Sequence, residues 1–281
     1  MNLLKSIFVS VYLAAAVAGL IKAILVMSSS GWLSPWLGTA IACAAPAIFF
    51  GQIMLMPRAR TSRNLGAVIA AGFGGTALSA TLGDTLVAPA VLIAACVGML
   101  GSLVYVFWYS RFGVPTNSAL GVGARLPDFE LSENGKRHST PELVRKPALW
   151  IFYRGNWCPL CVAQIKEIAA QYRELARRGV EVYLISPQSE ANSVALSKKM
   201  DAPMRFMTDA GSRAADILGI RIKDGLPAGF QALGYDSDVP RPTVFISEAG
   251  GRVIFLDMTD NYRVRPEPAT FFSVLDRHAI V

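Results

Sequence analysis

The stretch IFYRGNWCPLCVAQIKEI, residues 151–168, begins in an apolar run and ends in an amphipathic segment. Two cysteines, Cys158 and Cys161, lie between the two parts. The run 148–153 has the aromatic and β-branched composition of a buried strand. After Cys161, apolar residues recur at helical spacing as far as Gly179, and a glycine at such a position typically ends a helix. Cys158 is therefore predicted to lie where a strand leads into the N-terminus of a helix.

That position predicts redox chemistry. Pro159 suits a first helical turn, and the free N–H groups and dipole of a helix N-terminus stabilise a thiolate. We expect Cys158 to be the nucleophile with a lowered pKa, and Cys161 to resolve a mixed disulfide or sulfenic acid formed on it. A zinc site would need about four ligands, and His138 and His278 are isolated, so we predict no metal and no other cofactor. A purely structural disulfide across so short a loop would stabilise little.

The sequence around this stretch alternates strands and helices. The expected strands are DFEL (128–131), 148–153, 180–187, 204–209, 243–247 and 253–258, and the expected helices are 161–179, 190–200, 212–218 and 267–279. This order predicts an α/β thioredoxin-like domain over 126–281, after a Gly-, Ser- and Pro-rich linker at 110–125. The insert 220–242 is long for a connection, so we hypothesise that it lies over Cys158 and shapes substrate access.

The first 109 residues have a different composition. Their only charged residues are Lys5, Lys22, Arg58, Arg60, Arg63 and Asp84. Four apolar stretches, 6–27, 33–56, 65–83 and 87–109, predict a four-helix transmembrane domain in contact with membrane lipid. The chain's net charge of +7 does not indicate nucleic acid, because its cations are interleaved with acids or flank the apolar stretches.

Lysine and arginine placement predicts the orientation. With four spans, the N-terminus, the loop 57–64 and the C-terminal half share one side, and that side carries the basic residues. The opposite loops carry none, so the C-terminal half is expected on the cytoplasmic side of a bacterial inner membrane, in a multi-pass protein. If one span is miscounted, the same half would be periplasmic.

Cys43 and Cys96 lie about ten residues into spans that run in the same direction, in the similar contexts AIACAAP and LIAACVG. A small apolar residue packed among alanines explains both positions. The alternative is a membrane dithiol that passes electrons to the second domain.

The motifs of the second half also resemble a known family. GARLPDFELSENGKRHSTPELVRKPALWIFYRGNWCPLC, RPTVFIS and DNYRVRPEP together resemble peroxiredoxin-like proteins of the AhpC/TSA (redoxin) superfamily over about 121–281. The resemblance implies a thioredoxin fold, a peroxidatic role for Cys158, a resolving role for Cys161, and a thiolate-stabilising role for Arg241. It also implies that Pro242 is the proline, usually cis, that faces the active cysteines.

One position departs from that family pattern. Typical peroxiredoxins have Thr or Ser three residues before the cysteine, and this chain has Gly155 there, whereas WCPLC is similar to thioredoxin. Trp157 is expected to shield the thiol, as in thioredoxins, and simple packing is the alternative. Arg154 is expected to hold an anion or the thiolate, or to be solvated at the surface. Arg263 and Arg265 lie in a family-like YRVRP string without a role that the sequence defines.

The segment AAAVAGLIKA (14–23) weakly resembles the first helix of the four-helix DoxX/MauE membrane family, which is associated with thiol redox proteins. The sequence therefore predicts a membrane-anchored thiol-disulfide oxidoreductase or thiol peroxidase. Its expected partners are a thioredoxin-like or other dithiol reductant and a peroxide or protein disulfide substrate. The alternatives are a transmembrane electron conduit that feeds the redoxin domain and a non-enzymatic assembly factor that uses the redoxin fold.

Overall fold

A computed structural model describes residues 2–86, 88–113, 115, 118–258 and 260–280. Its contacts divide the chain into two compact units, residues 3–57 with 61–111 and residues 58–60 with 112–281, which are described separately. Position 87, where the fourth predicted span begins, lies outside the described residues. So do positions 114, 116 and 117 of the predicted linker and positions 1, 259 and 281 of the predicted domains.

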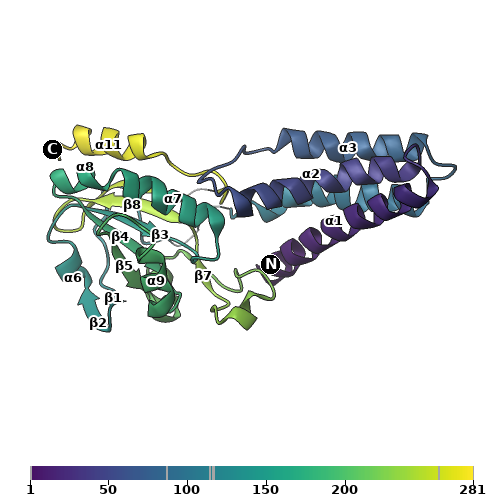
Figure 1. Cartoon of the computed structure of the whole chain (residues 1–281). Helices are drawn as coiled ribbons and strands as arrows, with labels where there is room; N and C mark the ends of the chain where they lie inside the picture. Colours follow the sequence, from purple (N-terminus) through teal and green to yellow (C-terminus); the bar gives the residue numbers. More distant parts are fainter. Residues whose placement is uncertain (1, 87, 114, 116–117, 259, 281) are drawn as a thin grey trace. The chain divides into compact units, whose positions relative to one another are not determined.

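The first unit is helical (Figure 1). Its described helices are α1 (Asn2–Ser30), α2 (Pro35–Leu55), α3 (Gly66–Thr81) and a helical run, Pro89–Tyr109, made of α4 (Pro89–Ile93), η1 (Ala94–Gly101), α5 (Ser102–Val104) and η2 (Tyr105–Tyr109). Three of these, α1, α2 and Pro89–Tyr109, are long and apolar enough to cross a membrane. The third predicted span corresponds to α3, whose 16 residues are fewer than the roughly 20 that a crossing needs.

Glycines allow the helices of this unit to approach closely. A Cβ atom on Gly38 would lie 2.3 Å from the Gly75 carbonyl oxygen of α3, and one on Gly72 would lie 2.5 Å from the Gly98 carbonyl oxygen of η1. Such contacts are the packing that small residues provide in membrane helix bundles.

The second unit is built on a seven-stranded sheet of order β2-β1-β5-β4-β3-β8-β9. The strands are β1 (Glu130–Glu133), β2 (Lys136–Ser139), β3 (Ala148–Phe152), β4 (Glu181–Ser186), β5 (Arg205–Thr208), β8 (Thr243–Ser247) and β9 (Val253–Asp257). Strands β3, β4 and β5 are parallel, whereas β8 and β9 run antiparallel to their neighbours. This is a thioredoxin-like α/β arrangement, as the sequence predicts.

Alternation along the central strands divides the core between two faces. Trp150, Phe152 and Phe245 belong to a buried cluster that also includes Ala214 and Ala215 of α10 (Arg213–Ile217). The alternate side chains of β3 point to the other face. Figure 1 shows α7 (Pro159–Ala170), α8 (Tyr172–Arg177) and α11 (Pro268–Arg277) along one side of the sheet. The remaining α-helices of the unit are α6 (Thr140–Leu143) and α9 (Glu190–Ser197).

The elements α7, α8 and β2 differ from the sequence-based expectation. The predicted helix 161–179 is interrupted at Gln171, whose φ of −102° and ψ of 2° separate α7 from α8. Strand β2, which the sequence analysis did not predict, pairs with β1 across Asn134 and Gly135. Both turn residues have positive φ, as tight two-residue hairpins require.

Candidate redox site

The two cysteines lie at the junction of β3 and α7, where the sequence places them. Cys158 is the N-cap of α7 with an extended backbone, and its Sγ accepts a hydrogen bond from the Cys161 N–H at 3.4 Å. Pro159 occupies the first turn. The cysteines form a disulfide with a Cα–Cα distance of 5.3 Å, and both are buried. A thiolate released at Cys158 would therefore face a helix N-terminus.

A buried guanidinium contacts the second cysteine. Arg265 donates from Nη2 to Cys161 Sγ at 3.4 Å, from Nη1 to Gln164 Oε1 at 2.7 Å and from Nε to the Tyr262 carbonyl oxygen at 3.2 Å. Burial, and then repulsion from Arg154, lower the pKa of Arg265 to about 9, so its side chain stays charged at neutral pH. The sequence signal for this residue was its place in the YRVRP string, which did not indicate a role.

Arg154 and Trp157 form a stacked group directly before the cysteines. Arg154 Cζ lies 5.1 Å from the centroid of the Trp157 ring and 5.9 Å from that of Tyr262, and Arg154 also donates to the Gly225 carbonyl oxygen. Its side chain is buried, which excludes the alternative that it is merely solvated at the surface. Among the described residues, its Nε atom has no hydrogen-bond partner.

The insert 220–242 packs against this group. It contains the short strands β6 (Arg221–Ile222) and β7 (Val239–Pro240), which pair with each other, and the 3-10 turn η4 (Phe230–Leu233). The Phe230 ring lies 5.5 Å and the Tyr235 ring 6.5 Å from Trp157, and the Tyr235 hydroxyl donates to Asn156 Oδ1 at 2.6 Å. The insert therefore contacts the residues immediately before Cys158, as the hypothesis of a covering loop requires. Sequence reasoning had not singled out Phe230 or Tyr235.

Gly155 has a conformation that explains why no hydroxyl residue stands there. Its φ is +147°, a region that side-chain-bearing residues rarely adopt. A Cβ atom at this position would lie 2.6 Å from Trp157 Nε1 and 2.7 Å from Trp157 Cδ1. Neighbouring Asn156 donates its backbone N–H to Gln188 Oε1 at 2.8 Å, which fixes the loop.

Arg241 lies between β7 and β8. Its Nη2 donates to the Gly113 carbonyl oxygen at 2.5 Å, and Cζ lies 5.4 Å from the Phe112 ring centroid. Burial lowers the pKa of this guanidinium, and Asp260 opposes the effect. Its role at the Cys158 thiolate stays a prediction.

Pro242 corrects one expectation. The described residues contain no cis peptide bond, so the Arg241–Pro242 bond is trans and the expected cis form is wrong. The trans form is the lower in energy for most X–Pro bonds, by about 0.5–1 kcal/mol. Here it carries an extended chain from β7 into β8, and the Thr243 hydroxyl donates to the Arg241 carbonyl at 3.0 Å. Pro242 itself is buried.

The other two cysteines belong to the first unit and are free thiols. Cys43 is buried in α2, close enough to α1 that a Cβ atom on Gly19 would lie 2.9 Å from its Sγ. Cys96 in η1 is exposed. Their environments differ, and their role as a membrane dithiol stays a prediction.

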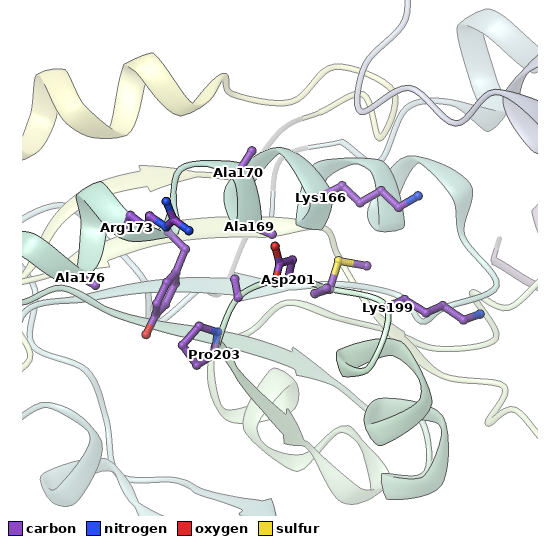
Figure 2. A pocket seen from close by; sticks show the side chains of 11 residues that line it. Lys166, Ala169, Ala170, Arg173, Ala176, Lys199, Asp201 and Pro203 are labelled. Carbon is purple, nitrogen blue, oxygen red and sulfur yellow. The ribbon is translucent and has the colours of Figure 1, made fainter.

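The second unit has a cavity of about 1010 Å³ whose lining includes neither Cys158 nor Cys161. Figure 2 shows the side chains that line it. The cavity is lined by parts of α7 and α8 and by residues 199–203, and its charged side chains are Lys166, Arg173, Lys199 and Asp201. No predicted site residue lines it. Among the described residues, no group of three or more His, Cys, Asp or Glu side chains could hold a metal ion.

Comparison with known proteins finds a family likeness in the second unit. Residues 122–255 match the AhpC/TSA family. Peroxiredoxin Q, chloroplastic, from Sedum lineare is 27% identical over 99 residues, which cover 35% of this chain and 53% of the relative. The chain thus spans about half the length of this curated relative. The family match leaves residues 1–121 uncovered, so the resemblance to DoxX/MauE proteins stays a prediction.

Solved structures are also similar to the second unit. Reduced Prx3 in complex with H₂O₂ from Vibrio vulnificus is 17% identical, with a TM-score of 0.49 and coverage of 56% of this chain and 99% of that one. Peroxidoxin BcpB from Mycobacterium tuberculosis is 16% identical, with a TM-score of 0.47 and coverage of 57% and 97%. Residues 122–255 therefore resemble the AhpC/TSA family, and the unit that contains them has a thioredoxin-like α/β fold.

Proposed function

We propose that the chain is a membrane-anchored thiol oxidoreductase that uses Cys158 as its nucleophile and Cys161 as its resolving thiol. The observation that carries the proposal is the disulfide at the N-terminus of α7 within the residues that resemble the AhpC/TSA family. A helix N-terminus favours a thiolate at Cys158, and Cys161 is one turn away, within bonding reach.

With a disulfide substrate, the Cys158 thiolate attacks one sulfur and forms a mixed disulfide, and the other substrate sulfur leaves as a thiolate that takes a proton from water. The Cys161 thiolate then attacks Cys158 Sγ, which forms the intramolecular disulfide and releases the second substrate thiolate. An external dithiol, such as a thioredoxin-like reductant, reduces Cys158–Cys161 and is itself oxidised to a disulfide. The first step depends on the thiolate fraction of Cys158.

With a peroxide substrate, the Cys158 thiolate attacks an oxygen, the O–O bond breaks, and Cys158 becomes a sulfenic acid while the alcohol or water leaves. Cys161 then displaces hydroxide from that sulfur, which leaves as water after protonation. Gly155 provides no hydroxyl for the peroxide, so we favour disulfide exchange as the faster of the two reactions. The insert 220–242 would select substrates through its contacts with Trp157 and Asn156.

We also propose that the first unit anchors the domain in a bacterial inner membrane. Its three long apolar helices support this, and the basic residues at 58–63 favour a cytoplasmic redoxin domain if α3 also crosses. A reporter fused after residue 281, active only in the periplasm, should then stay inactive. An active reporter would place the domain in the periplasm.

Turnover of the full chain in detergent micelles tests the activity. With dithiothreitol as the dithiol, the parent chain should reduce glutathione disulfide faster than hydrogen peroxide. The Cys158→Ser variant should reduce neither, and a Cys43→Ala/Cys96→Ala variant should match the parent as the control for thiol content. Equal turnover by parent and Cys158→Ser would refute the proposal.

A further inference from the structure

Arg265 is a buried cation, and no described residue of opposite charge forms an ion pair with it. Its hydrogen bonds within the described chain go to a carbonyl oxygen, an amide oxygen and the Cys161 sulfur, all neutral in the disulfide form. The charged and titratable groups that act on it are Arg154 and Arg60, which repel it, and Tyr262 and Asp257, which favour its charge. Burying a charge without a compensating partner is costly.

Reduction of the disulfide changes this balance. When the S–S bond opens, Cys161 Sγ can become a thiolate, and a guanidinium N–H at 3.4 Å from that sulfur then makes a charge-assisted contact. Gln164 holds the other Nη atom at 2.7 Å, so the guanidinium is already in place before the sulfur acquires charge. The arrangement favours the reduced, ionised form of Cys161 over its oxidised form.

We propose that Arg265 is a catalytic residue that stabilises the thiolate of Cys161, and so activates the resolving cysteine rather than the attacking one. Cys158 is activated by the N-terminus of α7, and Cys161, which is fully buried in that helix, by a guanidinium from the segment before α11. This inference rests on the proposed function of the cysteine pair. In thiol exchange, the Arg265-stabilised thiolate attacks Cys158 Sγ, the Cys158–Cys161 bond forms, the bond from Cys158 to the substrate sulfur breaks, and the substrate leaves as a thiolate.

The same contact affects the redox equilibrium. Stabilising the reduced form makes a dithiol pair more oxidising. Loss of Arg265 should therefore shift the equilibrium with glutathione toward the protein disulfide by about tenfold at mildly alkaline pH, which corresponds to about 30 mV for a two-electron couple.

Titration of the Cys161 thiolate tests the inference without any substrate. The full-length Cys158→Ser chain in micelles is titrated by its ultraviolet thiolate absorbance, and the curve of a Cys158→Ser/Cys161→Ser chain is subtracted to remove Cys43 and Cys96. Adding Arg265→Gln should raise the pKa of Cys161, with an acid dissociation constant lower by about tenfold or more. Arg265→Lys should recover part of the shift, because it restores the charge without the planar fork.

Two further variants keep the test decisive. Arg205→Gln is the control: it removes a half-buried arginine at the start of β5 that pairs with Glu133 of β1. It should leave the titration of Cys161 unchanged. If Arg265→Gln does not fold, as judged by circular dichroism, Gln164→Met releases Nη1 and should give a smaller shift in the same direction. An Arg265→Gln or Gln164→Met curve that superimposes on the Cys158→Ser curve would overturn the inference.

The outcomes separate the inference from the proposed function. A shifted titration in a chain that has no turnover would support the role of Arg265 and refute the activity. Turnover in the parent with an unshifted titration would support the activity and refute the role of Arg265.

Discussion

Replacing Gly155 tests whether the loop before Cys158 has the tight geometry that excludes a peroxiredoxin-like hydroxyl residue. Gly155→Ala adds one Cβ atom at a φ of +147°, and that atom would lie 2.6 Å from Trp157 Nε1. A backbone held in a sparsely populated region costs about 1–3 kcal/mol. Displacing Trp157 also weakens its packing on Phe230 and its cation–π contact with Arg154, each of which contributes about 0.5–1.5 kcal/mol.

The expected loss of stability is therefore about 2–4 kcal/mol, which lowers Tm by roughly 5–15 °C for a domain of this size. Thermal unfolding of the full chain in micelles, followed by circular dichroism, measures the shift. Gly179→Ala is the matched control, because Gly179 also has positive φ (+68°) but a Cβ atom there meets nothing within 4 Å. It should cost about 1–2 kcal/mol, from backbone strain alone.

The collision can be isolated in a Trp157→Ala background. There Gly155→Ala should cost less than in the parent chain and only the backbone strain, about 1–3 kcal/mol, since the atom that it meets has been removed. If Gly155→Ala costs the same with and without Trp157, or no more than Gly179→Ala in the parent chain, the argument from Trp157 is wrong. Gly155→Thr should likewise destabilise the chain and should not raise its rate with hydrogen peroxide. A faster peroxide reaction would show that the loop accepts the hydroxyl.

Three further predictions concern other parts of the chain. Tyr235→Phe removes the hydrogen bond to Asn156, so the insert 220–242 should open more readily. Cys158 of the reduced chain should then react several-fold faster with iodoacetamide. An unchanged rate would indicate that the insert does not limit access to Cys158. Arg177 and Arg178 hold the pKa of Glu174 well below its usual 4.5, at about 2, so this carboxylate stabilises the fold above pH 4.5 and loses that effect as the pH falls toward 2. The Glu174→Gln chain should therefore lose less stability than the parent over this pH interval, as measured by denaturant unfolding at low salt. Equal losses in the two chains would contradict the assignment. If Cys43 and Cys96 conduct electrons, the Cys43→Ala/Cys96→Ala variant should lose the membrane-dependent reduction of the second unit and keep its turnover with dithiothreitol. Unchanged membrane-dependent reduction would mean that the helices are only an anchor.

The central strands and the position of the cysteines could be predicted from local sequence. The predicted strands 148–153 and 180–187 agree with β3 and β4 to within one residue at each end. Both strands are buried, and buried strands have the apolar composition from which they were predicted. Cys158 as the N-cap of α7 follows from the same local pattern, with Pro159 marking the first turn.

The rest of the site depends on contacts between residues far apart in the sequence. Arg265 reaches Cys161 across 104 positions, and Tyr235 reaches Asn156 across 79, so no local pattern reveals either contact. The bond before Pro242 is trans, whereas the resemblance predicted a cis bond. The predicted span 65–83 exceeds α3 by Leu65 and Leu82, which are its two cap residues, and by Gly83.

The most direct test of the account is to map the covalent adduct on the Cys161→Ser chain. The reduced variant, in micelles, is treated with glutathione disulfide or with hydrogen peroxide and a sulfenic acid probe, and the modified peptide is identified by mass spectrometry. The account predicts a glutathione mixed disulfide that accumulates on Cys158 faster than the sulfenic acid adduct does. A Cys158→Ser/Cys161→Ser chain should show neither adduct beyond those on Cys43 and Cys96. Adducts confined to Cys43 or Cys96, with Cys158 unmodified, would contradict it.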